Sequence, residues 1–107
     1  MVKTITIDGR EIKLAANAAT PFRFRQMFKK DLLQILGNEE KAESEGVEAI
    51  SELAFIMAKQ AEGADLSKMS EDDFITWLEE FGPMAFIESA QDILEAYTDQ
   101  EKTTSFR

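Results

Sequence analysis

The first fifteen residues alternate between apolar and polar side chains, and this pattern predicts a β-hairpin over residues 2–15. Asp8 and Gly9, a pair favoured in two-residue hairpin turns, lie at its centre. Such a turn places the four large apolar side chains of the hairpin on one face: Ile5, Ile7, Ile12 and Leu14. Since an isolated hairpin is marginally stable in water, we expect this face to pack on a helix, with the first helix as its partner.

Periodic apolar positions then predict four helices, at about residues 21–36, 46–62, 70–81 and 83–97. In the first helix, the apolar side chains that share one face are Phe24, Met27, Phe28, Leu32 and Ile35. Thr20 is expected to cap this helix with its hydroxyl, and Gly37 to end it. The second helix is apolar around most of its girth, which is typical of a helix that lies at the centre of a fold or is covered by another subunit.

These elements predict an α+β fold that is mostly α: an N-terminal β-hairpin packed on a bundle of about four helices, in a single domain of residues 1–98. The glutamate-rich segment 38–45 is interpreted as a solvated connector or a frayed helix start, with an acidic interaction loop as the alternative. Residues 99–107 have no apolar period, so we expect a mobile C-terminal tail. Ser70 and Asp73 are spaced as in a capping box.

The charge is acidic and unevenly distributed. The chain has 107 residues and a net charge of −9, with a local charge of +4 over residues 1–37 and −13 over residues 38–107. The acidic total argues against nucleic acid as a partner, because phosphate binding requires a basic surface. The asymmetry is interpreted first as two solvated faces of opposite charge. The alternative is a homo-oligomer in which the basic end of one copy attracts the acidic end of another.

The residues that most often carry catalysis and metal binding are absent. The sequence contains neither histidine nor cysteine. It therefore lacks the commonest general base, a thiol nucleophile and the usual ligands of transition metals. It also contains no glycine-rich phosphate loop, and a calcium loop starting at Asp65 lacks the required glycine at its sixth position. We therefore expect no enzyme, no catalytic residue, no cofactor and no metal site.

Neither a membrane span nor a secretory signal is predicted. No stretch approaches about 18 consecutive apolar residues, and the N-terminus has no apolar h-region. We therefore expect an intracellular protein that does not enter a membrane.

Protein binding remains the main expectation for function. Large apolar side chains at helix edges or off the main stripes are candidates for a docking patch, as are the basic side chains of the first helix. These candidate residues are Phe22, Arg23, Arg25, Lys29, Lys30, Phe55, Phe81 and Met84. The basic residues interleaved with aromatic ones also suggest a nucleic-acid surface, but aromatic residues at helical spacing are more often part of a core.

The order of segments resembles the tail assembly chaperones of long-tailed phages and prophages that infect Gram-positive bacteria. A hairpin leads through a short Ala/Asn connector into a helix with the pattern T-P-x-x-[FY]-x-x-x-F-x-x-D-L-L, which is carried by Thr20, Pro21, Phe24, Phe28, Asp31, Leu32 and Leu33. The segments ISELAFIMAKQAEG and MSEDDFITWLEEF are similar to the second and third helices of the family. The resemblance covers about residues 2–97.

The resemblance implies a non-catalytic role. Such chaperones bind the long, helical, aggregation-prone tape measure protein in the host cytoplasm until the tail tube assembles around it, and they are absent from the mature virion. The major tail protein is a further expected partner. In many such phages a longer form is also made by ribosomal frameshifting. The alternative expectation is a small acidic adaptor or regulatory domain, of phage or bacterial origin, that binds another protein.

Overall fold

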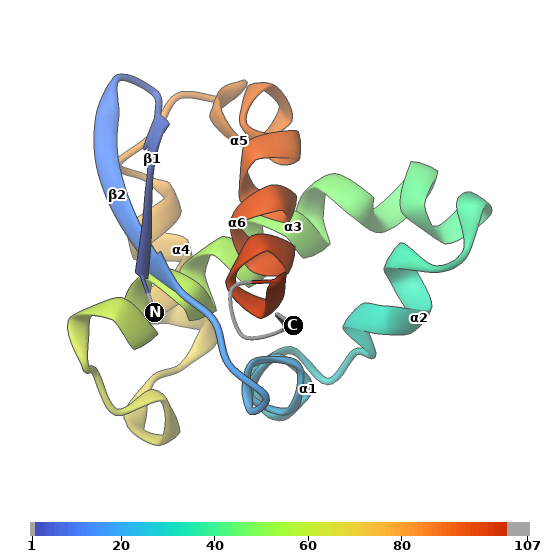
Figure 1. Ribbon diagram of the computed structural model, residues 1–107, viewed down its shortest axis with the longest axis horizontal. Coiled ribbons are helices and arrows are strands. Elements are labelled where there is room, and N and C mark those ends of the chain that lie inside the picture. Colours follow the sequence, from blue (N-terminus) through green and yellow to red (C-terminus); the bar gives the residue numbers. More distant parts are fainter. Residues whose placement is uncertain (1, 103–107) are drawn as a thin grey trace.

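The structure, a computed structural model, describes the backbone of residues 2–102 and the side chains of residues 2–98. A two-stranded antiparallel hairpin is followed by helices arranged around one long helix (Figure 1). The predicted α+β, mostly α, fold is confirmed. In chain order the elements are β1 Val2–Ile7, β2 Arg10–Ala15, α1 Thr20–Phe28, α2 Leu32–Leu36, α3 Glu39–Glu62, the 3-10 turn η1 Leu66–Lys68, α4 Glu71–Leu78, α5 Ala85–Glu88 and α6 Ala90–Lys102.

The hairpin has the register that its sequence predicts. Ile5 pairs with Ile12, and Ile7 with Arg10 across the turn. Asp8 and Gly9 both have positive φ, 54° and 78°, as a type I′ turn requires. Ile7 and Leu14 are fully buried, whereas the side chains of the opposite face are exposed.

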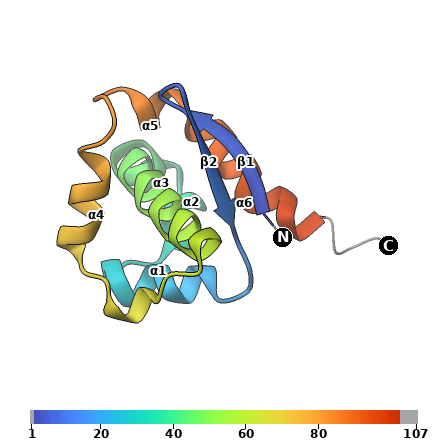
Figure 2. The same ribbon diagram turned by 90° about the vertical axis from the view of Figure 1, so that its left-hand side faces the viewer.

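The partner of the hairpin is different from the predicted one. Its apolar face packs mainly on α3 and α6, not on α1. Figure 2 shows α3 between α4 and α6, with the hairpin across α3. Every residue from 49 to 58 is buried, which only a helix covered on all sides can achieve. The organising element of the fold is therefore α3, and α1 is one of the helices that pack on it.

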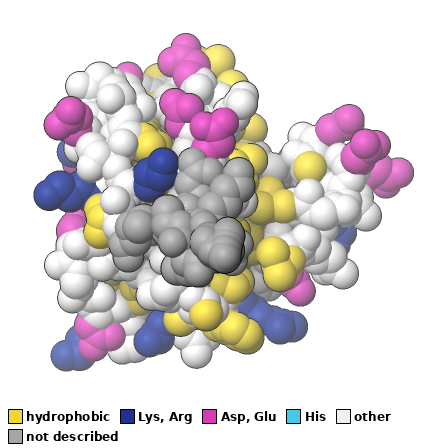
Figure 3. Space-filling view, in the orientation of Figure 1, with side chains coloured by type: hydrophobic (Ala, Val, Ile, Leu, Met, Phe, Trp, Pro, Cys, Tyr) yellow, Lys and Arg dark blue, Asp and Glu magenta, His cyan; other side chains and the backbone are white. Residues whose placement is uncertain are grey.

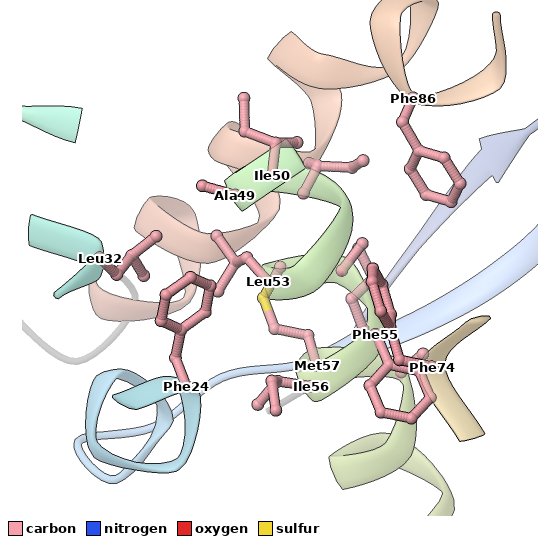
Figure 4. Close-up of a cluster of buried hydrophobic side chains, with 14 of the residues drawn as sticks. Phe24, Leu32, Ala49, Ile50, Leu53, Phe55, Ile56, Met57, Phe74 and Phe86 are labelled. Carbon is pink, nitrogen blue, oxygen red and sulfur yellow. The ribbon is translucent and has the colours of Figure 1, made fainter. Parts of the chain in front are cut away.

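Aromatic rings connect α1, α3 and α4 in the core. The ring of Phe28 lies 5.4 Å from that of Phe24 and 5.0 Å from that of Phe74, and Phe74 in turn lies 5.4 Å from Phe55. Most of these pairs meet edge to face or tilted, the geometry that aromatic quadrupoles prefer. Figure 4 shows Phe24 facing Leu53 of α3 on one side and Phe55 beside Phe74 on the other.

The first predicted helix, 21–36, is broken into α1 and α2. Lys29 adopts the left-handed conformation with φ of 59°, and Asp31 caps α2 by accepting a hydrogen bond from the backbone N–H of Gln34 (3.2 Å). Thr20 is not the N-cap, because Ala19 occupies that position. The Thr20 hydroxyl instead accepts from the N–H of Asn17 (2.9 Å) and donates to Gln60 of α3 (3.0 Å).

The other helix boundaries also shift. The second predicted helix starts at Glu39 rather than 46, because Asn38 caps it by accepting from the N–H of Lys41 (3.1 Å) and its first turn is acidic. The segment 38–45 is thus mostly helix. The third predicted helix ends at Leu78, and its capping box is present: the N–H of Ser70 donates to Asp73 (2.9 Å).

The last predicted helix, 83–97, consists of α5 and α6, which are separated at the buried Ser89. The structure continues α6 to Lys102, so the first residues of the expected tail 99–107 are helical. The rest of that tail lies outside the described residues.

No helix among the described residues is long and apolar enough to cross a membrane.

Candidate protein-binding surface

The outer face of α1, together with the residue that follows the helix, carries half of the predicted binding residues. Its exposed side chains, which we call the α1 surface, are Phe22, Arg23, Arg25, Gln26 and Lys29. The Phe22 side chain is 67% exposed, the largest exposed fraction among the exposed large hydrophobic residues of the described part. Two cations of the α1 surface contact Gln26 of the same helix. Arg23 donates a hydrogen bond to the side chain of Gln26 (3.3 Å), and Lys29 donates one to the backbone oxygen of Gln26 (2.8 Å).

Hollows lie on two sides of the α1 surface. One of about 370 Å³ separates α1 from η1 and is lined by Arg23, Gln26, Met27, Leu66, Ser67 and Met69. Another of about 340 Å³ lies beside α2 and is lined by Arg25, Lys29, Lys30, Asp31, Gln34, Ile35, Lys41 and Glu45. Figure 3 shows hydrophobic side chains over α1 and between α6 and α2, with basic side chains near them and acidic ones at the start of α3. This end of the molecule therefore combines apolar and cationic groups.

Lys30 does not belong to the exposed face. Its Nζ lies 2.6 Å from a carboxylate oxygen of Glu48 and 2.9 Å from Oε1 of Glu52, both on α3. Glu52 is only 5% exposed, and its Oε1 has the ionic contact but no hydrogen bond of good geometry. Lys30 therefore fastens the α1–α2 junction to the centre of the fold rather than facing a partner.

The surroundings of Lys30 and Glu52 shift the pKa of both side chains. Burial raises the pKa of Glu52, and the neighbouring Glu48 and Glu71 act in the same direction, whereas the contact with Lys30 opposes it. Burial lowers the pKa of Lys30, but its contacts with Glu48 and Glu52 outweigh that effect, so the net shift is upward. Lys30 therefore holds its proton more tightly than a free lysine does, and Glu52 ionises less readily than a free glutamate because burial disfavours its charged form.

The prediction that Phe55 belongs to an exposed patch is wrong. Its side chain is completely buried, with ring centroids 5.4 Å from Phe74 and 5.6 Å from Trp77. Phe55 lies off the main apolar stripe of α3, but residues 49–58 of this helix are covered on every side, so a position off the stripe is still inside the core.

Phe81 and Met84 lie at the other end of the molecule from α1. Phe81 is half-buried, with its ring 5.0 Å from Trp77 and with the Arg10 guanidinium 4.8 Å above it. Met84 is 51% exposed and directly precedes α5. In Figures 1 and 2, α5 and α1 lie at opposite ends. The candidate residues therefore do not form one site.

The loop that carries these residues is tied to the hairpin turn. The Asp8 carboxylate accepts a hydrogen bond from the N–H of Gly82 (2.9 Å), and Arg10 lies 3.0 Å from the carboxylate of Glu80. Contacts between residues seventy or more positions apart thus hold this loop, and its half-buried aromatic residue has a structural role.

Sequence reasoning missed several exposed apolar residues. The missed residues with at least 44% exposure in the helices are Leu33, Val47, Ile75 and Ile87. Adjacent helical residues point about 100° apart, so Leu33 turns outward because Leu32 is buried, and Ile75 because Phe74 is buried. That angular difference was present in the sequence as a signal.

No group of three or more acidic side chains among the described residues is arranged to hold a metal ion. No family model, curated protein or solved structure matches the chain.

Proposed function

We propose that this chain is a tail assembly chaperone of a long-tailed phage or prophage, which binds the tape measure protein and keeps it soluble in the host cytoplasm during tail assembly. It acts by binding, without catalysis or a cofactor, and is not retained in the mature virion. The sequence pattern from Thr20 to Leu33 suggests this role. The structural observation that supports it is the α1 surface, where an exposed aromatic residue is surrounded by cations on an acidic protein.

The α1 surface has the chemistry that a helical client requires. A large exposed aromatic residue is a common anchor in protein interfaces, since it buries much area at a small cost in side-chain entropy. Arg23, Arg25 and Lys29 around Phe22 complement acidic residues that flank the apolar stripe of an amphipathic helix. The net charge of −9 keeps the chaperone itself soluble.

Co-expression with the tape measure protein tests the proposal directly. The gene of this client is expected close to that of the chain, after the gene of the major tail protein. We expect more soluble tape measure protein, and its recovery in a complex with the chain. Unchanged solubility and no complex would contradict the proposal and favour the adaptor alternative, whose partner would be a different protein.

A pair of substitutions locates the contact. Phe22→Ser removes the exposed ring of the α1 surface and is expected to reduce recovery of the complex. Ile75→Ser is the matched control. Ile75 is also an exposed apolar residue, at 49%, but it lies on α4 and is not part of the α1 surface. If both variants retain the client equally well, the α1 surface is not the contact.

The proposal extends to self-association. The basic residues of the α1 surface and the acidic residues of α4 carry opposite charges, so copies are expected to associate more weakly as salt is added. Sedimentation at several salt concentrations measures this. A monomer at every concentration of protein and salt would remove the oligomer from the proposal.

A further inference from the structure

A short segment between the end of α1 and the start of α3 covers the outer part of α3. Residues 29–37, which we call the strap, begin with the left-handed Lys29 and end at Gly37, whose N–H bonds to the oxygen of Leu33 (2.9 Å). The strap has its own N-cap, Asp31, and contains the five-residue helix α2. A helix of this length is not stable by itself in water. Its conformation therefore depends on its packing against α3.

The apolar attachment of the strap consists of three side chains of α2. Leu32 and Ile35 are buried, at 1% and 3% exposure, and the half-buried Leu36 also packs against the core, so α2 packs on α3. Figure 4 shows Leu32 beside Phe24 at the edge of the core. The outward side chain of Leu33 is 62% exposed. The hollow of about 340 Å³ beside α2 also leaves one side of the strap open to solvent.

The polar attachment of the strap depends on one side chain. Lys30 is the cation that contacts both Glu48 and Glu52, which lie one turn apart on α3. Without it, two carboxylates at i and i+4 would repel each other, and the buried one would lose its ionic partner. Lys30 thus reduces this repulsion in the closed position of the strap and gives the buried carboxylate an ionic partner.

We propose that the strap opens from α3 as a unit while the rest of the fold stays intact, and that Lys30 is the latch that keeps it closed. The hinges are the left-handed Lys29 at one end and Gly37 at the other. Opening uncovers the part of α3 beneath Leu32 and Ile35, together with the carboxylates of Glu48 and Glu52. The uncovered surface suits an amphipathic helix that brings its own basic residue. The opening does not depend on the proposed chaperone function, because it is a property of the isolated chain.

Native-state hydrogen exchange of the isolated chain tests the strap. The N–H groups of Ile35 and Gly37 bond within the strap, to Asp31 (3.1 Å) and Leu33 (2.9 Å), and therefore report its opening. We expect them to exchange faster than the amides of residues 53–57, with little dependence on low concentrations of urea. If the strap amides exchanged at the same rate as those of residues 53–57, with the urea dependence of global unfolding, the proposal would be overturned.

Lys30→Met tests the latch. Losing a charge-assisted contact to a buried carboxylate is expected to accelerate exchange in the strap roughly tenfold, with the amides of residues 53–57 affected much less. The control is Lys68→Met, which removes an exposed lysine of η1, outside the strap, and is expected to leave strap exchange unchanged. Equal acceleration of the strap and residues 53–57, or none in the strap, would contradict the assignment of Lys30. If Lys30→Met does not fold, Glu52→Gln measures the same latch from its other partner.

Discussion

Two parts of α3, a buried half and an outer half, differ in burial, in charge and in the elements that contact them, although they belong to one continuous helix. The buried half, residues 49–58, has no exposed residue and contacts the hairpin and the aromatic core. The outer half, residues 39–48, carries mostly exposed and charged side chains, and α2 is the element that lies over it. A continuous helix therefore need not be equally stable along its whole length. The packing of neighbours, not the helix itself, decides where the chain resists unfolding.

The largest loss of stability is expected from Phe28→Asp. Phe28 is 6% exposed and its ring contacts those of Phe24 and Phe74, through which it reaches the buried half of α3. A carboxylate there is buried without a partner, so the domain is expected to lose at least about 4 kcal/mol and to unfold or aggregate. Circular dichroism on heating measures this. A melting temperature equal to that of the wild type would show that this face of α1 is outside the core.

A matched pair on α3 compares its halves directly. Leu53 is fully buried and Val47 is 44% exposed, six positions earlier on the same helix. Leu53→Ala is expected to cost about 2–5 kcal/mol through the cavity that it leaves. Val47→Ala is expected to change stability by less than about 0.5 kcal/mol, since alanine favours the helix and little packing is lost. Urea unfolding measures both, and similar losses would contradict the division of α3.

A pH-dependent effect is expected at the border between the halves. Burial raises the pKa of Glu52 above its ordinary value of 4.5, and the nearby Glu48 and Glu71 act in the same direction. The contact with Lys30 opposes this rise. A raised folded-state pKa means that the native state binds the proton more tightly than the unfolded state. The contribution of Glu52 to stability is therefore full below pH 4.5 and is lost as the pH rises through the folded-state pKa.

Glu52→Gln isolates this effect. The free energy of unfolding of the wild type, measured relative to Glu52→Gln, is expected to rise as the pH falls through the raised folded-state pKa toward 4.5. Urea midpoints of both proteins at several pH values provide the measurement. A difference that is constant with pH, or that falls on acidification, would show that the buried carboxylate titrates in its ordinary range.

A small effect is also expected at the hairpin turn. Arg10 contacts Glu80 and the ring of Phe81, but both members of the ion pair are about half exposed. Arg10→Met is therefore expected to cost about 1 kcal/mol or less. A loss comparable with that of Leu53→Ala would mean that exposed contacts at the turn stabilise the fold as strongly as the buried half of α3.

Local sequence signals predicted the parts of the fold that depend on neighbours along the chain. The turn at Asp8 and Gly9 and the capping box at Ser70 and Asp73 both formed as expected, because each is satisfied within a few residues. The break between α1 and α2 also had a local signal that was overlooked. Asp31 with Gln34 three residues later has the spacing of a helix start.

Contacts between distant segments could not be predicted in the same way. The burial of Phe55 follows from α3 being covered on all sides, and the sequence left open whether that cover was this chain or another subunit. The pairing of Lys30 with Glu52 joins a break in one helix to the middle of another, and no spacing rule connects them. Only Phe22, Arg23, Arg25 and Lys29 of the candidate binding residues share one exposed face.

Hydrogen exchange along α3 in the unmodified chain tests the central claim most directly. We expect the amides of residues 50–58 to exchange only through global unfolding, with the full dependence on urea. The amides of residues 42–47 are expected to exchange through local opening, faster and with little dependence on urea. If all amides of α3 exchanged at one rate with one urea dependence, the helix would open as a single unit, and the division into a buried and an outer half would be wrong.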